Sequence, residues 1–219
     1  MLVDIIVDEI QLYLRQTICY QEEECEVDFF IWMAKRCPHS LLGNADSTGC
    51  NPLHLACYLL FEAHSKGWNT GEICKYLIQK CPDSARVTTQ GRLPIHILQS
   101  RCKYTYVREV VVCLLREYPQ SIDIPEPNDH TPPSSFLFIQ SVKLLLDEEK
   151  DLRETAVSLT YTTSSLTEAL TRNKDKLTRS ALTVFGSWTT SFINTTEDKL
   201  KLISNRLKDM CNEGLEHDE

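Results

Sequence analysis

A short phrase returns three times along the chain at nearly even spacing. It reads GCNPLH at residues 49–54, GRLPIH at residues 91–96 and, more weakly, DHTPPS at residues 129–134. The marker residues Pro52, Pro94 and Pro132 set steps of 42 and 38 residues. A period in this range indicates one supersecondary unit stacked on the next. The repeat favours an extended array that presents a binding surface over a single catalytic pocket.

A second phrase recurs at nearly the same period as the first. It reads CPHS at residues 37–40, CPDS at residues 81–84 and YPQS at residues 118–121. Each of its prolines is expected to end a helix, because proline disfavours the helical conformation of the residue before it. When the sequences are aligned on these prolines, each column of the preceding helices stays apolar or aromatic, as in Ile73 and Val110 or Leu77 and Leu114.

The spacing of apolar residues predicts the helices themselves. Val3 to Leu14 follows the i, i+3, i+4, i+7 pattern of one helical face, and Asp28 to Arg36 predicts a second helix. Pro52 to Phe61 and Pro94 to Tyr104 begin with proline, which is favourable at the first helical position. The repeating element is therefore helix, loop, helix and an extended connector that starts at the serine of the second phrase. A loop over Glu62 to Gly71, which carries Trp68, is expected to lengthen the first full unit.

Charge and cysteine content limit the function classes. The 219 residues carry a formal charge of −8, which argues against a general nucleic-acid binder because phosphate contacts need clustered Lys and Arg. Acidic residues within the first apolar stretch resemble neither a signal peptide nor a membrane span. The ten cysteines are therefore interpreted as reduced thiols, and we expect a cytoplasmic or nuclear protein.

The repeated phrase resembles the ankyrin-repeat motif Gly-x-Thr-Pro-Leu-His-Leu-Ala. Residues 49–56 match it almost throughout, residues 91–96 in part, and Thr131-Pro132 keeps only its core dipeptide. The long units and the Pro-x-Ser helix endings resemble divergent arrays common in diatom-type algae. The resemblance covers Asp28 to Ile139 and implies an all-α fold: a short ankyrin-like solenoid of about four helix-turn-helix units including caps. We expect this array at residues 1–146, with a helical extension at residues 147–219.

His54 and His96 occupy the same phase of neighbouring units, so a structural role is expected for both. The resemblance implies that each ties a hairpin to a helix by hydrogen bonds. Cys50, His54 and Cys57 could suggest zinc, but the next copy has Arg92, His96 and Gln99 at the matching places. We therefore expect no metal and no cofactor. No nucleophile elbow, phosphate-binding loop or metalloprotease helix motif is found, and the chain is interpreted as a non-enzyme.

The leading hypothesis is a protein-interaction scaffold or adaptor that binds another protein on the concave face implied by the resemblance, with no small-molecule substrate. The positions implied to face the partner lie at the hairpin tips and on the first helices: Ser47, Thr48, Cys50, Tyr58, Thr89, Gln90, Arg92, Ser100, Arg101, Asn128 and His130. Tyr58, Arg92 and Arg101 are the expected anchors, because aromatic and Arg side chains dominate binding hot spots.

The extension at 147–219 is rich in Ser and Thr and does not continue the repeat. From Leu177 onward, one helical stripe collects bulky apolar residues: Leu182, Phe185, Trp188, Phe192 and Ile193. Such a stripe usually packs on the same protein or on a second copy. Because the opposite face has almost no charge, 177–193 also resembles helices that bind curved lipid. A peripheral membrane adaptor is therefore the alternative hypothesis.

Overall fold

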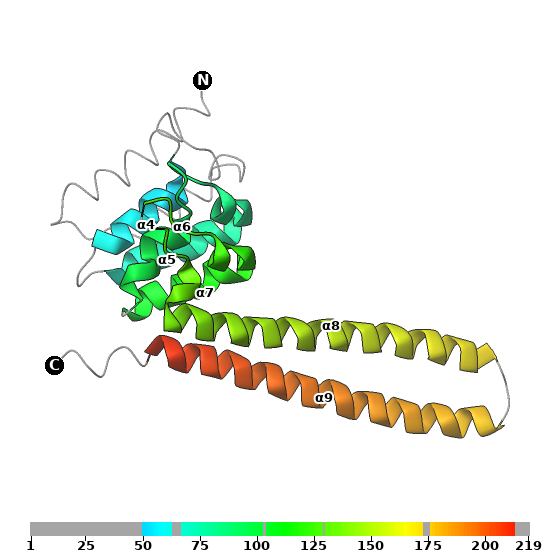
Figure 1. The fold of residues 1–219 in the computed structure, drawn as a ribbon. Helices are drawn as coiled ribbons and strands as arrows, with labels where there is room; N and C mark the ends of the chain where they lie inside the picture. The colour runs from blue at the N-terminus through cyan, green and yellow to red at the C-terminus, as the bar shows by residue number, and fades with distance from the viewer. Residues whose placement is uncertain (1–49, 63–66, 103, 129, 173–175, 213–219) are drawn as a thin grey trace. The chain divides into compact units, whose positions relative to one another are not determined.

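The computed structural model describes residues 50–62, 67–102, 104–128, 130–172 and 176–212 (Figure 1). This part of the chain is mostly helical and contains no strand, only an isolated bridge between Thr89 and Arg92. The all-α expectation is confirmed at this level. The helices predicted over Val3 to Leu14 and Asp28 to Arg36 lie outside the described residues. Two compact units divide the chain, one of residues 1–143 and 211–219 and one of residues 144–210.

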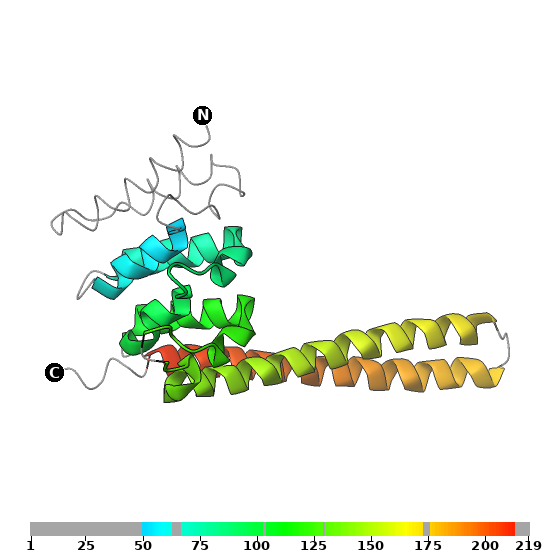
Figure 2. The ribbon, with the colours of Figure 1, turned by 45° about the horizontal axis from the view of Figure 1, so that its top comes forward.

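Two helix pairs form the described core of the first unit. The first pair is α4 (Pro52–Glu62) and α5 (Gly67–Lys80). The second is α6 (Pro94–Leu98), extended by the 3-10 turn Gln99–Arg101, and α7 (Thr105–Glu117). Helix α4 packs on α5 and α6, and α5 packs on α7, so like elements of the two pairs lie on each other (Figure 2).

The apolar columns seen in the aligned repeats form this core. Ile73 on α5 and Val110 on α7 are fully buried, and Leu77 and Leu114 are almost so. The columns aligned from the two units are therefore part of the buried core of the first unit. This explains why residue type is preserved at the repeat period while the exposed positions between the columns vary.

The connectors differ from the extended segments expected after each second phrase. A 3-10 helix comes first in both units, at Pro82–Arg86 and Pro119–Asp123, and the chain becomes extended only afterwards. The cause is the serine of the phrase. Ser84 Oγ donates to Cys81 O and Ser121 Oγ donates to Tyr118 O, each at 2.6 Å. Each bond joins the serine to the residue three positions earlier and so stabilises a tight turn.

The expected loop over Glu62 to Gly71 is also corrected. Helix α4 continues to Glu62, and α5 already begins at Gly67, so Trp68 lies in the first turn of a helix. The glycines here do not break the chain. An added Cβ on Gly71 would lie 3.6 Å from Tyr106 Cβ, which is an ordinary van der Waals contact, so this position does not require glycine.

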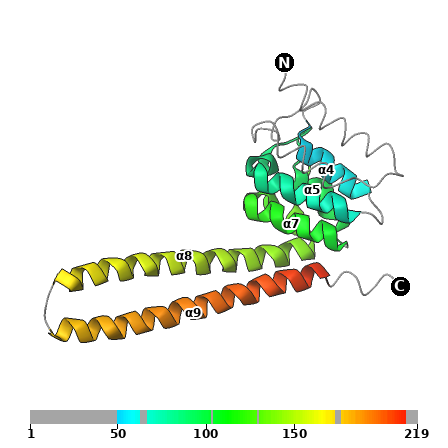
Figure 3. The same cartoon turned by 180° about the vertical axis from the view of Figure 1, so that it is seen from behind.

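The second unit is a pair of long helices. Helix α8 (Leu137–Arg172) begins in the first unit and runs unbroken through residue 146, and α9 (Lys176–Asn212) returns beside it in the opposite direction (Figures 1 and 3). The stripe expected on α9 therefore has a long helix of the same chain next to it.

Half-buried and buried residues of both helices recur at steps of three, four or seven residues, the spacing expected of a seam between two helices. Its α8 side consists of half-buried residues: Leu145, Glu149, Leu152, Ala156, Leu159 and Thr163. Its α9 side consists of buried residues: Thr189, Thr196, Ile203 and Leu207. The threonines can be buried because Thr189 Oγ1 donates to Phe185 O and Thr196 Oγ1 donates to Phe192 O.

Gly91→Ala is expected to destabilise the first unit. Gly91 has φ +80, and an added Cβ would lie 2.9 Å from Pro127 Cγ, so alanine brings both backbone strain and a clash. We expect a loss of about 1–3 kcal/mol in the free energy of unfolding, measured by urea denaturation.

Gly186→Ala is the matched control. Nothing lies within 4 Å of an added Cβ at this mid-helix position, so the same substitution should stabilise α9 by about 0.5–1 kcal/mol. Two effects of the same sign would contradict the described backbone at one of the two glycines.

Candidate functional site

Each histidine of the repeated phrase reaches the backbone of the next segment. His54 Nε2 lies 3.1 Å from Arg92 O, and His96 Nε2 lies 2.9 Å from Ile124 O. Both imidazoles are buried. His96 Nδ1 accepts the N–H of Leu93, so its Nε2 carries the proton that it donates. The structural role expected for the two histidines is therefore confirmed, and each ring bonds a backbone carbonyl that lies 38 residues (His54) or 28 residues (His96) further along the chain.

The His54 ring is held on its other side by Asn51. Asn51 Oδ1 accepts the His54 N–H at 2.9 Å and lies 2.7 Å from His54 Nδ1, while Asn51 Nδ2 donates to Ser84 O at 3.3 Å. Burial lowers the pKa of His54, and the bond to Arg92 O opposes this effect only in part. The ring is therefore stabilised in its neutral form.

The two turns in these connectors project residues with unusual backbone angles. Gln90 has φ 52 and His130 has φ 58, and both are exposed. In the first turn, Thr89 and Arg92 exchange backbone hydrogen bonds at 2.9 Å. In the second, His130 N donates to Glu126 O at 2.9 Å. Left-handed conformations without glycine are uncommon and mark positions that the surrounding structure fixes.

The residues expected to face a partner are not equally accessible. Four are exposed: Gln90, Ser100, Asn128 and His130. Four are half-buried: Cys50, Tyr58, Arg92 and Arg101. Thr89 is buried, and Ser47 and Thr48 lie outside the described residues. The two turns and the ends of α4 and α6 therefore supply the accessible members of the set.

Arg92 is engaged within the protein. Its Nε lies 2.8 Å from Glu126 Oε1, and Gln99 Nε2 donates to Glu126 Oε2 at 3.2 Å. Glu126 is 7% exposed, so its carboxylate needs these partners. Glu126 was not among the residues predicted from the sequence to form a site, because its partner Arg92 comes from a different turn.

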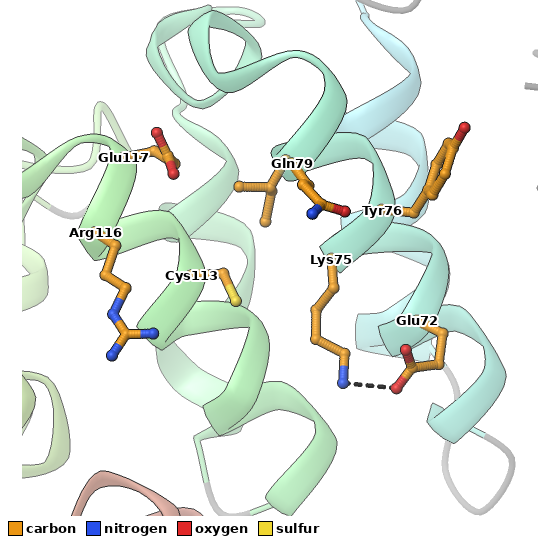
Figure 4. A pocket seen from close by; sticks show the side chains of 8 residues that line it. Glu72, Lys75, Tyr76, Gln79, Cys113, Arg116 and Glu117 are labelled. Atoms are coloured by element: carbon orange, nitrogen blue, oxygen red, sulfur yellow. Dashed lines mark ion pairs between the residues drawn. The ribbon is translucent and has the colours of Figure 1, made fainter. Parts of the chain in front are cut away.

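A cleft of about 470 Å³ opens between α5 and α7. Figure 4 shows Lys75, Glu72, Gln79 and Cys113 among its lining side chains. Lys75 Nζ lies 2.6 Å from Glu72 Oε1 and 2.7 Å from Glu109 Oε2. Burial lowers the pKa of Lys75, but these bonds outweigh it and the net pKa is raised. Lys75 is therefore held as an ammonium ion, not as a nucleophilic amine.

The seven cysteines of the described residues are free thiols. Burial raises the pKa of Cys102 to about 12 and that of Cys211 to about 11, so neither forms a thiolate at neutral pH. Within the described ranges, no group of three or more His, Cys, Asp or Glu side chains is placed to hold a metal ion.

On α9, the aromatic residues of the expected stripe contact one another. The Trp188 ring lies 6.0 Å from the Phe185 ring and 6.0 Å from the Phe192 ring, with tilted planes. Phe185, Phe192 and Ile193 are half-buried, whereas Trp188 is 54% exposed. The side chain of Leu182 is not among those described. No described helix combines the length and apolarity needed to cross a membrane.

Compared with known proteins, the chain matches no family model, no curated protein and no solved structure. The ankyrin resemblance therefore stays an expectation that rests on the repeated phrases.

Stability is expected to fall as the pH decreases through about 6.5. The pKa of His54 is lowered in the folded protein from its ordinary value of 6.5, so the unfolded chain binds more protons in the window below that value. The His54 contribution is therefore fully present above the window and is lost towards mildly acidic pH. Urea denaturation at pH 7.5 and pH 5.5, the two sides of the window, measures the difference.

His54→Gln is the comparison variant for this effect. It removes the titrating ring, so it should be less stable at neutral pH and should lose less stability on acidification than the unmodified chain. An equal loss in both proteins would show that His54 is not the group responsible.

Proposed function

We propose that the first unit is a non-enzymatic protein-binding scaffold of ankyrin-like design. The observation that carries this proposal is the bond from each of two buried histidines to a backbone carbonyl of the connector that follows its helix pair. Each bond fixes a connector relative to the helix pair before it, although the acceptors differ: Arg92 O lies at the end of the first turn, whereas Ile124 O precedes the second. Connectors fixed in this way form a surface that a folded partner can recognise.

The proposed binding face combines the two turns with the accessible ends of α4 and α6. Gln90 and His130 lie at the tips of the turns, and Tyr58 and Arg101 provide the larger side chains beside them. Positive φ values fix the two tips, so little conformational entropy is lost when a partner binds there. Arg92 contributes less directly, since its guanidinium pairs with Glu126.

The ligand class proposed for this face is another protein. Its accessible members include one aromatic side chain, Tyr58, and two arginines, Arg92 and Arg101, which are residue types enriched in protein interfaces. The formal charge of −8 supports partners that are neutral or basic and disfavours nucleic acid. A cytoplasmic or nuclear setting is proposed with it.

The alternative, a peripheral membrane adaptor, draws its support from the exposed Trp188 and from the lack of charge around it. The hairpin weakens this alternative. Phe185, Phe192 and Ile193 are half-buried in the described structure, so only part of the stripe is open to lipid.

The test is alanine substitution of the full chain at Tyr58 and, separately, at Arg101, with affinity measured for a partner captured by photo-crosslinking from Gln90. Removal of an anchor should weaken binding by about tenfold, as truncation of a hot-spot residue does. Arg92→Ala is unsuitable, because it would leave the buried Glu126 without its cation.

Gln79→Ala is the control for this experiment. Gln79 is exposed on α5 and lines the cleft between α5 and α7, outside the proposed face. Crosslinking from Gln79 to the same partner, or unchanged affinity in both anchor variants at unchanged helicity, would remove the proposed face.

A further inference from the structure

The longest stretch of the chain without an acidic residue is strongly basic. Residues 84–108, here called the basic stretch, contain no Asp or Glu, although the chain has 31 of them. They contain five basic residues: Arg86, Arg92, Arg101, Lys103 and Arg108. Asp83, which precedes the stretch, pairs with Arg86 at 3.8 Å, and Glu109, which follows it, pairs with Lys75 at 2.7 Å. The sign of the charge in this stretch is therefore opposite to the formal charge of −8 of the whole chain.

One arginine and two tyrosines of the basic stretch lie together at the start of α7. The Tyr104 and Tyr106 rings stack, with their centroids 5.4 Å apart and their planes at 9°. Burial and the neighbouring Tyr104 raise the pKa of Tyr106, and the charge of Arg101 opposes this rise only in part. All three residues are half-buried, so part of each side chain is accessible. We call Arg101, Tyr104 and Tyr106 the Arg–Tyr cluster.

The Arg–Tyr cluster presents hydrogen-bond donors. The guanidinium of Arg101 contains donors only, and a tyrosine that stays protonated at neutral pH can donate through its hydroxyl. Tyr104 is also the N-cap of α7, where no side chain caps the first backbone N–H groups and no acidic residue lies in the first turn. Donors that surround a positive charge select a negatively charged acceptor.

Arg108 adds a further positive charge at this end of α7. Its Nε donates to the carbonyl oxygen of Cys102, which directly follows Arg101 in the chain, and its guanidinium lies 4.9 Å from the centre of the Phe138 ring. Both of these groups are neutral, so the contacts orient the side chain and do not cancel its charge. The cluster therefore lies in a locally positive environment, since charges more than about 8 Å away are largely screened at physiological salt.

We propose that an acidic segment of the partner protein docks on the Arg–Tyr cluster, with a carboxylate bound by Arg101 and the tyrosine hydroxyls. The proposal rests on the proposed scaffold function, because Arg101 belongs to the proposed binding face. Arg and Tyr dominate binding hot spots, and a guanidinium can bind a carboxylate through two parallel hydrogen bonds. The partner can be neutral or basic as a whole, because only the charges of its docking segment lie within the screening length.

The arrangement of the side chains favours an acidic peptide over nucleic acid. A single strand needs a basic groove along its backbone and open aromatic faces on which its bases stack. Tyr104 and Tyr106 stack on each other, so one face of each ring is already covered. Two of the five basic residues are engaged elsewhere: Arg92 pairs with Glu126, and Arg86 lies 5.6 Å from the centre of the Tyr118 ring, after the last residue of α7.

Binding of short fluorescein-labelled peptides to the full chain tests this proposal by fluorescence anisotropy. The probes repeat Glu-Ala-Gly, Gln-Ala-Gly or Lys-Ala-Gly and differ only in charge. The Glu peptide should bind about tenfold more tightly than the Gln and Lys peptides, because only its side chains pair with Arg101. Its affinity should fall between about 0.1 M and about 1 M salt, since the screening length shortens from about 10 Å to about 3 Å.

Substitutions then locate the site. Arg101→Gln should weaken binding of the Glu peptide by about tenfold, with helicity monitored. Arg86→Gln is the matched control, because Arg86 belongs to the same basic stretch but lies over Tyr118 at the other end of α7, and it should leave the affinity unchanged. Tyr104→Phe and Tyr106→Phe keep both rings and remove only the hydroxyls, so they test the site even if Arg101→Gln does not fold. Each should weaken binding by about two- to tenfold.

Equal affinity for the Glu and Gln peptides, or equal effects of the Arg101 and Arg86 substitutions, would overturn the proposal. Tighter binding of single-stranded oligodeoxythymidylate than of the Glu peptide would assign the cluster to nucleic acid and also reject it. The scaffold function is judged separately. It would stand without an acidic partner if the Glu peptide failed to bind while the partner crosslinked from Gln90 still depended on Tyr58.

Discussion

The bond from a buried imidazole to the backbone of the next segment is the contact on which the first unit depends. His54 and His96 each occupy the start of a first helix, and each bonds a carbonyl of the following connector. A helix pair of this size cannot bury its apolar face alone, so it needs a neighbour. The imidazole bonds hold the connectors in place, and the apolar columns pack the helices against one another. In both units a serine hydrogen bond forms the turn that follows the second helix.

The sequence predicts these features well because they recur. The start of α4 and α6 at proline, the buried columns of α5 and α7 and the histidine bonds all follow from phased residues. Features that occur once are harder to predict. The Glu126 pairing with Arg92 depends on a side chain that comes from a different turn, and the start of α5 at Gly67 places two glycines inside a helix despite their low helix propensity. Neither feature can be predicted from the helix propensity of the local sequence.

In the second unit, too, some features cannot be predicted from the periodicity of apolar residues. Periodicity identifies the apolar stripe of α9, but the partner of its buried side is a helix rich in Ser and Thr, whose seam mixes leucines with Glu149 and Thr163. Threonines that bond their own helix can occupy a buried seam, so a simple division into polar and apolar faces misplaces them. The two units thus present two surfaces of different kind: turns with fixed tips on one, and an uncharged helical stripe on the other.

Native-state hydrogen exchange in low urea tests the central claim, that the two described helix pairs stabilise each other. The account predicts that amides of α5 and α7 exchange through the same opening reaction, with equal free energies and equal dependence on urea, because neither pair persists without the other. If the amides of α5 exchanged through a separate opening while α7 stayed protected, the pairs would be independent. The imidazole bonds would then be incidental to the fold.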